Sequence, residues 1–308
     1  MFNASGARNF FGEGFPFHKA WRLLGMTWEN TTFISKTTTL EPRKGNMPLK
    51  DDGVTPKQFK PSCIVVNFRK GLVLNAVGLS GPGANCLFER GEWQRWPKPL
   101  LLSFMAVSAT KEERLEELDH FVSLFKRYLP FASPVGLQIN YSCPNVGLHL
   151  DDLYNEIGLG FDLADQLRIP LIAKFNPTIP ASLVIDIARF KICDAVSLTN
   201  TVPWGQCADK IPWEKLFGRE TSPLAHLGGG GLSGPPVLPI VINLIKQCIE
   251  GGIAKPIMGG NGVQSGADAQ AVINAGASGI ELGIIGIVRP QRMRETIECA
   301  NKMLGVKG

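Results

Sequence analysis

The sequence predicts a (β/α)8 barrel, because short apolar segments alternate with longer amphipathic segments along most of the chain. The apolar segments suit strands that are buried on both faces of a parallel sheet. The chain has 308 residues, 44% of them hydrophobic, which is enough to bury the core of such a barrel. An open, doubly wound sheet is the alternative, but no G-x-G-x-x-G turn follows the first strand.

Two strands are predicted near the N-terminus. "MFNA" (1–4) precedes a helical segment at 17–25, and "TTFISK" (31–36) precedes a long polar stretch. The segment from about 37 to 95 breaks the alternation and has too few apolar runs for a core of its own. We therefore expect a single domain over residues 1–308, with an insertion after strand 2, at about 37–95, that forms the rim or lid of a site.

Each of the other six predicted strands is followed by a helix. The strands are 101–107, 135–141, 170–175, 194–199, 255–260 and 278–284, and the helices that follow them are 111–129, 150–167, 180–190, 235–252, 265–276 and 290–304. With the two upstream strands, these units make up the eight strands that a closed barrel requires.

The charge and the cysteine content argue against a nucleic-acid-binding protein and against a disulfide-linked or metal-binding one. The net charge is +5, and the basic residues are spread along the chain without a nucleic-acid-binding motif. The seven cysteines have irregular spacing and form no C-x-x-C, which argues against disulfides and against a metal site. We expect reduced thiols in a cytoplasmic protein. No signal peptide or membrane-spanning apolar run is present, so no membrane partner is expected.

A barrel carries its active site at the C-terminal ends of its strands. Lys36 and Lys174 stand directly at two of these ends, where a buried ammonium group needs a polar or anionic partner. No strand end supplies Asp or Glu, which favours a ligand over a structural ion pair. Glycine-rich turns at 228–236, 258–266 and 276–285 favour a phosphorylated cofactor, since their backbone N–H groups can approach phosphate oxygens.

The segment "LQINYSCPN" (137–145) ends the fourth predicted strand. Cys143 could be a small buried apolar residue, which is the usual role of a free cysteine. Here it lies between Asn140 and Asn145, whose amides can bond to a planar polar ligand. No histidine pattern for a Cys–His nucleophile is evident, so the position favours a general base.

These motifs together resemble those of the dihydroorotate dehydrogenases, FMN-dependent (β/α)8 barrels of pyrimidine biosynthesis. The matching segments are "NASG" (3–6), "SKTTTLEPRKGN" (35–46), "NAVGL" (75–79), "NYSCPN" (140–145), "AKFNP" (173–177), "TNT" (199–201), "GGLSG" (230–234), "GGNGVQSG" (259–266) and "GASGIELG" (276–283). They run from the first predicted strand to the last, in the family's order.

The resemblance implies oxidation of (S)-dihydroorotate to orotate. Cys143 would remove the proton from C5 while C6 gives a hydride to flavin N5, and a cysteine base resembles the soluble class 1 enzymes. Lys36 would touch both flavin and substrate. The implied substrate residues are Lys36, Asn75, Val77, Gly78, Leu79, Asn140, Asn145, Asn200 and Thr201. The implied FMN residues are Ala4, Ser5, Lys36, Thr37, Asn140, Lys174, Gly234, Gly262, Gly283 and Ile284.

Several alternatives stay open. The electron acceptor could be fumarate, NAD through a partner subunit, or another oxidant, and the resemblance suggests a homodimer or a heterotetramer with an iron–sulfur/FAD subunit. Gly81 stands where the family commonly has Asn, which leaves a related FMN oxidoreductase acting on another dihydropyrimidine as a second reading. A catalytically inactive nucleotide-binding barrel is the non-enzyme alternative.

Overall fold

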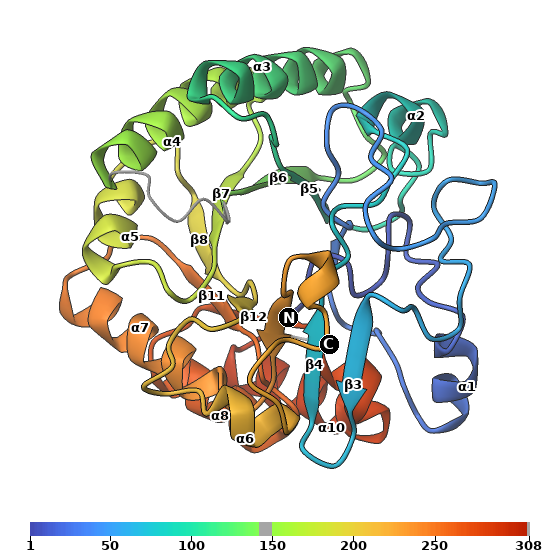
Figure 1. Ribbon diagram of the computed structural model, residues 1–308. Coiled ribbons are helices and arrows are strands. Elements are labelled where there is room, and N and C mark those ends of the chain that lie inside the picture. The colour runs from blue at the N-terminus through green and yellow to red at the C-terminus, as the bar shows by residue number, and fades with distance from the viewer. Residues whose placement is uncertain (142–149, 307–308) are drawn as a thin grey trace.

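The computed structural model describes residues 1–141 and 150–306, and among them eight strands form one parallel barrel (Figure 1). Each predicted strand position holds one of them: β1 (Phe2–Asn3), β2 (Phe33–Ile34), β5 (Leu100–Phe104), β6 (Val135–Asn140), β7 (Leu171–Phe175), β8 (Ala195–Leu198), β11 (Ile257–Gly260) and β12 (Gly279–Leu282). Consecutive barrel strands in the sequence are neighbours in space. The predicted (β/α)8 fold is confirmed.

The barrel closes where β1 meets β2, and this seam is short. Thr32 N–H donates to Met1 O at 2.8 Å, and Asn3 N–H donates to Thr32 O at 3.2 Å. The fully buried Asn3 side chain then extends the seam, since its Nδ2 donates to Ile34 O at 2.7 Å and its Oδ1 accepts from Ile34 N–H at 3.2 Å. A side chain thus replaces backbone pairing between two-residue strands.

Helices surround the strands, as Figure 1 shows, and on the side of the segment between β2 and β5 the chain is mostly loop, with the short helices α1 (His18–Leu23) and α2 (Ala84–Glu89). The helices that agree with the predicted ranges are α1, α3 (Lys111–Arg127), α4 (Leu150–Ala164), α5 (Ala181–Ala188), α7 (Leu238–Glu250), α8 (Gly266–Asn274) and α10 (Met293–Met303). Further short ones are α6 (Trp213–Phe217), α9 (Ile285–Val288) and the 3₁₀ turns η1 (Asp165–Leu167), η2 (Ala225–Leu227) and η3 (Pro290–Arg292).

The inside of the barrel changes from apolar to polar along its axis. Ile34, Leu101, Ile172 and Met258 form an apolar cluster of their own, separate from the large core between strands and helices. Lys36, Ser103 and Lys174 each lie two residues after a member of this cluster and are buried and polar. The neighbouring strands contribute three more buried polar side chains, which are Gln138, Ser197 and Glu281. Because strand side chains alternate in direction, these residues face the interior above the apolar cluster.

A second, antiparallel sheet lies outside the barrel and was not predicted. It has the order β3 (Ile64–Asn67), β4 (Leu72–Asn75), β10 (Gly231–Ser233) and β9 (Val202–Pro203). The sheet joins the predicted insertion to the long loop after β8, since Asn75 pairs with Gly231 in its register. β9 and β10 are two and three residues long, too short for a periodic pattern in the sequence.

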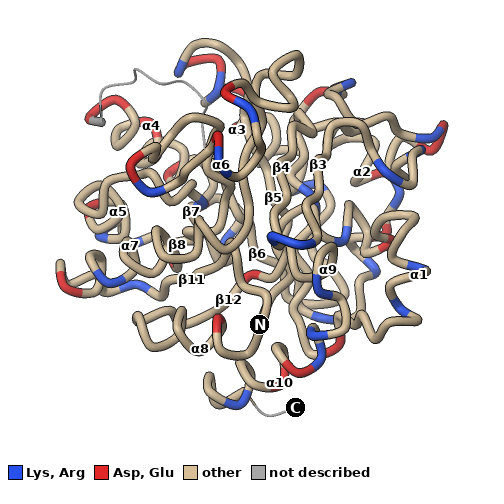
Figure 2. The backbone as a smooth tube through the Cα atoms, turned by 60° about the horizontal axis from the view of Figure 1, so that its bottom comes forward, with Lys and Arg blue, Asp and Glu red and all other residues tan. Residues whose placement is uncertain are grey.

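Charged residues are distributed around the molecule, as the sequence analysis expects. Figure 2 shows Lys and Arg on many elements, with Asp and Glu among them. Within the described part of the chain, no helix has the length and apolar character needed to cross a bilayer. The described cysteines, which are Cys63, Cys86, Cys193, Cys207, Cys248 and Cys299, are all free thiols, as predicted.

We predict that Asn3→Ala destabilises the barrel by about 2–4 kcal/mol, because it leaves the buried N–H and C=O of Ile34 without their partner. Urea unfolding followed by circular dichroism measures this loss. Asn67→Ala is the matched control. The Asn67 side chain accepts an exposed hydrogen bond from Lys70 N–H, so its removal should change the free energy of unfolding little. Equal stability of the two variants would show that the seam does not depend on Asn3.

Candidate functional site

A cavity of about 650 Å³ opens at the C-terminal ends of the barrel strands, within the size range of ligand sites. Most residues that the sequence analysis selected line it together: Ala4, Ser5, Lys36, Thr37, Asn75, Val77, Gly78, Leu79, Asn140, Lys174, Asn200, Thr201, Gly283 and Ile284. Gly234 and Gly262 are not among the lining residues, although Ser233 is. Cys143 and Asn145 lie outside the described residues.

Lys36 follows β2 and is almost completely buried, with 6% of its surface exposed. Its Nζ donates to Ser80 O at 2.6 Å and lies 4.7 Å from the centre of the Phe10 ring. Burial lowers the pKa of Lys36 to about 8, against an opposing influence of Glu13. An ammonium group has three donors, and the Ser80 carbonyl takes one, so the group can also bind an anion in the cavity.

The asparagines form a connected set of neutral hydrogen-bonding groups. Asn200 Nδ2 donates to Asn140 Oδ1 at 3.3 Å, and Asn200 Oδ1 accepts from Thr201 N–H at 3.0 Å. Asn75 Nδ2 lies 3.4 Å from Gly231 O, across the second sheet. Amides can both donate and accept, so this wall of the cavity suits a planar ligand with its own amide groups.

The turn that carries Val77, Gly78 and Leu79 is held by the motif "KGN" at 44–46. Asn46 N–H donates to Val77 O at 2.8 Å, and Asn46 Nδ2 donates to Ala76 O at 2.7 Å. Gly45 must be glycine, because a Cβ there would lie 2.3 Å from Ser80 Oγ and 2.7 Å from Gly78 O. The insertion therefore contributes a fixed backbone wall to the cavity.

On the side of the cavity next to β1 and β12, the lining has hydroxyl groups and a glycine packed against the neighbouring chain. Ser5 Oγ and Thr37 Oγ1 are 2.8 Å apart, and Thr37 Oγ1 is 2.9 Å from Ser103 Oγ. Gly283 lies against Ala4, whose Cβ would be 3.2 Å from a Cβ at position 283. This side has small side chains and accessible hydroxyls, which leaves room for a large polar ligand to approach the backbone.

Gly234 and Gly262 do not line the cavity, and they are in contact with each other. Gly262 has φ +90°, and a Cβ there would lie 2.5 Å from Gly234 O. Asn261 connects the region to the amide set, because its Oδ1 accepts from Gly234 N–H at 3.2 Å and its Nδ2 donates to Asn200 O at 2.8 Å. The sequence analysis did not assign Asn261 a role, and the structure gives it this bridging one.

Lys174 extends from β7 and is 5% exposed. Burial lowers the pKa of Lys174, and the carboxylate of Glu281 opposes that fall. Glu281 was missed by the sequence analysis, which looked for carboxylates only at strand ends, whereas this residue lies within β12. Glu281 is therefore an anionic neighbour of Lys174 that the strand ends did not reveal, and the preference for a ligand as the partner of Lys174 stays a prediction.

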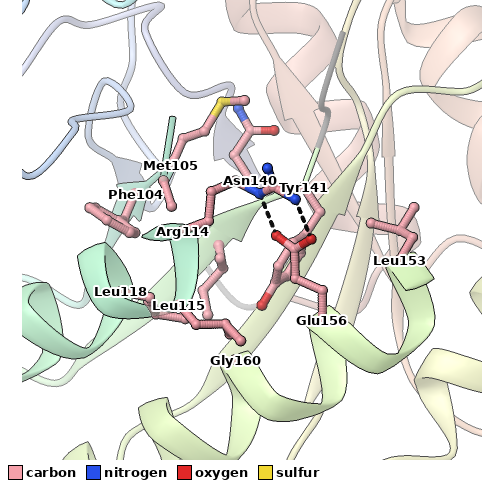
Figure 3. A pocket seen from close by; sticks show the side chains of 12 residues that line it. Phe104, Met105, Arg114, Leu115, Leu118, Asn140, Tyr141, Leu153, Glu156 and Gly160 are labelled. Atoms are coloured by element: carbon pink, nitrogen blue, oxygen red, sulfur yellow. Dashed lines mark hydrogen bonds and ion pairs between the residues drawn. The ribbon is translucent and has the colours of Figure 1, made fainter. Parts of the chain in front are cut away.

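A smaller cavity of about 30 Å³, with room for water, adjoins the first one (Figure 3). Arg114 lines both cavities and forms a buried bidentate ion pair with Glu156, at 2.7 and 2.6 Å. Arg114 Nη1 also donates to Ala109 O at 2.8 Å. The pair ties α3 to α4, the helix that follows residues 142–149, and no local pattern in the sequence points to it.

The described lining therefore combines four cationic side chains, which are Lys36, Lys174, Arg43 and Arg114, with neutral amides, hydroxyls and backbone groups. No group of three or more His, Cys, Asp or Glu side chains within residues 1–141 and 150–306 could hold a metal ion. The arrangement suits an organic anion with amide-like edges, beside a larger ligand that contacts the β1–β12 side.

Comparisons with known proteins agree with this arrangement. A relative from Desulforudis audaxviator, described as dihydroorotate dehydrogenase B (NAD(+)), catalytic subunit, is 28% identical over 264 residues, covering 83% of this chain and 75% of the relative. A protein of the same description from Bacillus pumilus is 26% identical, covering 90% and 81% of the two chains. Dihydroorotate dehydrogenase A (fumarate) from Lacticaseibacillus paracasei is 25% identical, covering 89% and 83%.

The fold has a solved counterpart in DHODH from Eimeria tenella, crystallised in complex with ferulenol. The two structures superpose with a TM-score of 0.62 at 20% sequence identity, covering 89% of this chain and 75% of that one. The family model described as dihydroorotate dehydrogenase matches residues 27–298. Since this match spans most of the 308 residues, the chain belongs to the dihydroorotate dehydrogenase family.

Proposed function

We propose that this protein oxidises (S)-dihydroorotate to orotate in pyrimidine biosynthesis, with FMN as its bound cofactor. One observation carries the proposal. Lys36, Lys174 and the amides of Asn75, Asn140 and Asn200 converge on one cavity of a chain that belongs to the dihydroorotate dehydrogenase family.

The substrate side of the cavity fits an anionic pyrimidine. Dihydroorotate has one carboxylate and a ring edged by amide groups, so it needs one cation and several neutral partners. Lys36 supplies the cation, and Asn75, Asn140, Asn200 and Thr201 supply donors and acceptors that are themselves neutral. Asn145 joins this set in the proposal, and the backbone from Val77 to Leu79 forms its wall.

The other side of the cavity fits FMN. Ser5 and Thr37 offer hydroxyl groups, and the turn at Gly283 and Ile284 offers backbone close to Ala4. Lys174 would face the flavin ring, Gly234 would be a further flavin contact, and Gly262, Gly283 and Ile284 would lie near the phosphate. The cofactor, when bound, accepts a hydride at N5, and the protein supplies its position and electrostatic environment.

Proton removal is assigned to Cys143. In the proposal its thiolate takes the proton from C5 while the hydride leaves C6, so that the C5–C6 double bond of orotate forms. A thiol acts as a base only when it is deprotonated or has a path for its proton. Lys36 would hold the carboxylate of the substrate during this step.

The acceptor of the electrons and the partners of the chain are a separate part of the proposal. Relatives described as NAD-linked catalytic subunits support a heterotetramer with an iron–sulfur/FAD subunit, and the fumarate-linked relative supports a homodimer. A cytoplasmic location is proposed with either. The free state of the described cysteines fits that location.

A related FMN oxidoreductase with another dihydropyrimidine substrate is the second candidate function. Gly81 motivates it, because a Cβ at this position would lie 2.7 Å from Phe10 Cζ. The space that a larger polar residue would need is therefore filled by an aromatic ring. Gly81 adjoins Ser80, whose carbonyl accepts from Lys36, so the difference lies close to the substrate.

Anaerobic addition of dihydroorotate to the purified, FMN-loaded protein tests the function. We expect rapid bleaching of the flavin absorbance, because the reductive half-reaction needs no acceptor. A protein that stays yellow with dihydroorotate but bleaches with another dihydropyrimidine would support the second candidate. A protein that takes up no FMN would overturn the flavoenzyme proposal, and one that binds FMN but bleaches with neither substrate would support the inactive nucleotide-binding barrel.

We predict that Cys143→Ser slows this flavin reduction by about 10²-fold or more, since a positioned base contributes roughly 10²–10⁴-fold and serine is a much weaker acid than cysteine. Stopped-flow absorbance measures the rate. Cys86→Ser, which changes a partly exposed cysteine on α2, should retain the wild-type rate. Wild-type reduction by Cys143→Ser would rule out the assignment of the base.

The low pKa of Lys36 predicts a pH dependence of orotate binding. The ammonium is almost fully charged well below pH 8, half charged near pH 8 and largely neutral above it, so orotate affinity should fall by up to about tenfold per pH unit above pH 8. Flavin absorbance titrations at pH 6.5–9.5 measure the dissociation constant. Lys36→Met should bind weakly with a flat profile over this range, and a flat profile in the wild type would contradict the prediction.

A further inference from the structure

The buried carboxylate of Glu281 lies one layer below the cavity, inside the barrel. It is 1% exposed, and three side chains donate to it. Oε1 accepts from Gln138 Nε2 at 2.8 Å and from Ser197 Oγ at 2.7 Å, and Oε2 accepts from Thr199 Oγ1 at 2.9 Å. All three donors are neutral, so they solvate a negative charge without cancelling it, and a buried charge needs an opposite charge nearby.

Lys174 is placed to provide that charge. In the parallel register of β7 and β8, Lys174 is paired with Ser197, so both side chains point into the barrel. Thr199 donates to Glu281, and Thr199 and Lys174 both line the cavity. Glu281 and Lys174 therefore occupy adjacent layers of one interior, with the lysine nearer to the cavity.

The balance of charge around the cavity makes Glu281 distinctive. The described lining includes Lys36, Arg43, Arg114 and Lys174 but neither Asp nor Glu. Arg114 has its own carboxylate in Glu156. Glu281 lies below this lining, and its charge opposes the fall that burial causes in the pKa of Lys174.

We propose that Glu281 is a positioning residue for Lys174: its buried carboxylate, bonded to the Ser197 that pairs with Lys174, supplies the opposite charge that favours the ammonium at the edge of the cavity where the flavin ring binds. This inference rests on the proposed flavin site. It makes the relative affinity of the protein for reduced and oxidised flavin depend on a residue that lies below the cavity lining.

The proposal predicts two opposing electrostatic effects with different ranges. A protonated Lys174 stabilises the more negative, reduced flavin, so loss of its charge weakens binding of that form. The negative charge of Glu281 itself disfavours reduced flavin, but from one layer deeper. With Lys174 present, removal of Glu281 acts mainly through the lysine; without Lys174, only the direct effect of the carboxylate remains.

The test is a double-mutant cycle in the FMN-loaded protein, with the midpoint potential of the bound flavin as its readout. Glu281→Gln preserves shape and should weaken binding of reduced relative to oxidised FMN by about tenfold, which corresponds to a potential about 30 mV lower for two electrons. In the Lys174→Met background the same change should raise the potential. Asp194→Asn is the matched control, since Asp194 accepts from Leu171 N–H at the opposite end of the barrel.

A potential that rises in both backgrounds would show that Glu281 acts only as a distant charge, and an unchanged potential would show that it does not act on the flavin. Either result overturns the inference. A wild-type protein that binds FMN but is not reduced by dihydroorotate would instead count against the proposed reaction and leave this cycle intact.

Thermal unfolding without flavin gives a second reading of the same pair, which is useful if Glu281→Gln folds poorly. Lys174→Met should lower the melting temperature, because it leaves a buried carboxylate without its counter-charge. Adding Glu281→Gln to Lys174→Met should restore much of that loss. A double variant that is less stable than Lys174→Met would refute the pairing, whether or not FMN binds.

Discussion

The burial of ionised side chains at the open end of a closed barrel is the constraint on which the rest of the structure depends. Lys36 and Lys174 are 6% and 5% exposed, so each needs compensation within the fold or from a ligand. Lys36 bonds to the Ser80 carbonyl, which requires the turn after β4, and that turn requires Gly45 and Asn46. Residues of the predicted insertion thus hold this ammonium group in place.

The strands and most helices could be predicted because their periodicity is local. Segments of four to six residues, such as β5, β6 and β7, have apolar runs that stand out from their flanks. The second sheet could not be predicted, since β10 becomes a strand only by pairing with the distant β4, and β9 only by pairing with β10. The barrel seam was hidden for the same reason, because Asn3 and Ile34 are 31 residues apart and their bond is between a side chain and the backbone.

The same distinction holds for the site. Lys36 and Asn200 were identified because a barrel directs residues at strand ends to one face, whereas Asn75, at the end of β4 in the second sheet, was identified from the family resemblance; all three share a cavity. Glu281 was missed because it stands inside a strand, where an apolar neighbour on each side makes it resemble an ordinary barrel position. The Arg114–Glu156 pair was missed because it joins two helices 42 residues apart. Such supporting residues contact each other only in the folded chain, so a local sequence pattern does not reveal them.

Asn261 links residues on two sides of the cavity. It accepts from the backbone N–H of Gly234 and donates to the backbone carbonyl of Asn200, so two short hydrogen bonds join a residue proposed for the flavin to one proposed for the substrate. Hydride transfer needs substrate and flavin in contact with a defined orientation, and a hydrogen-bonded link between the two sets of residues favours such an arrangement in the proposed chemistry.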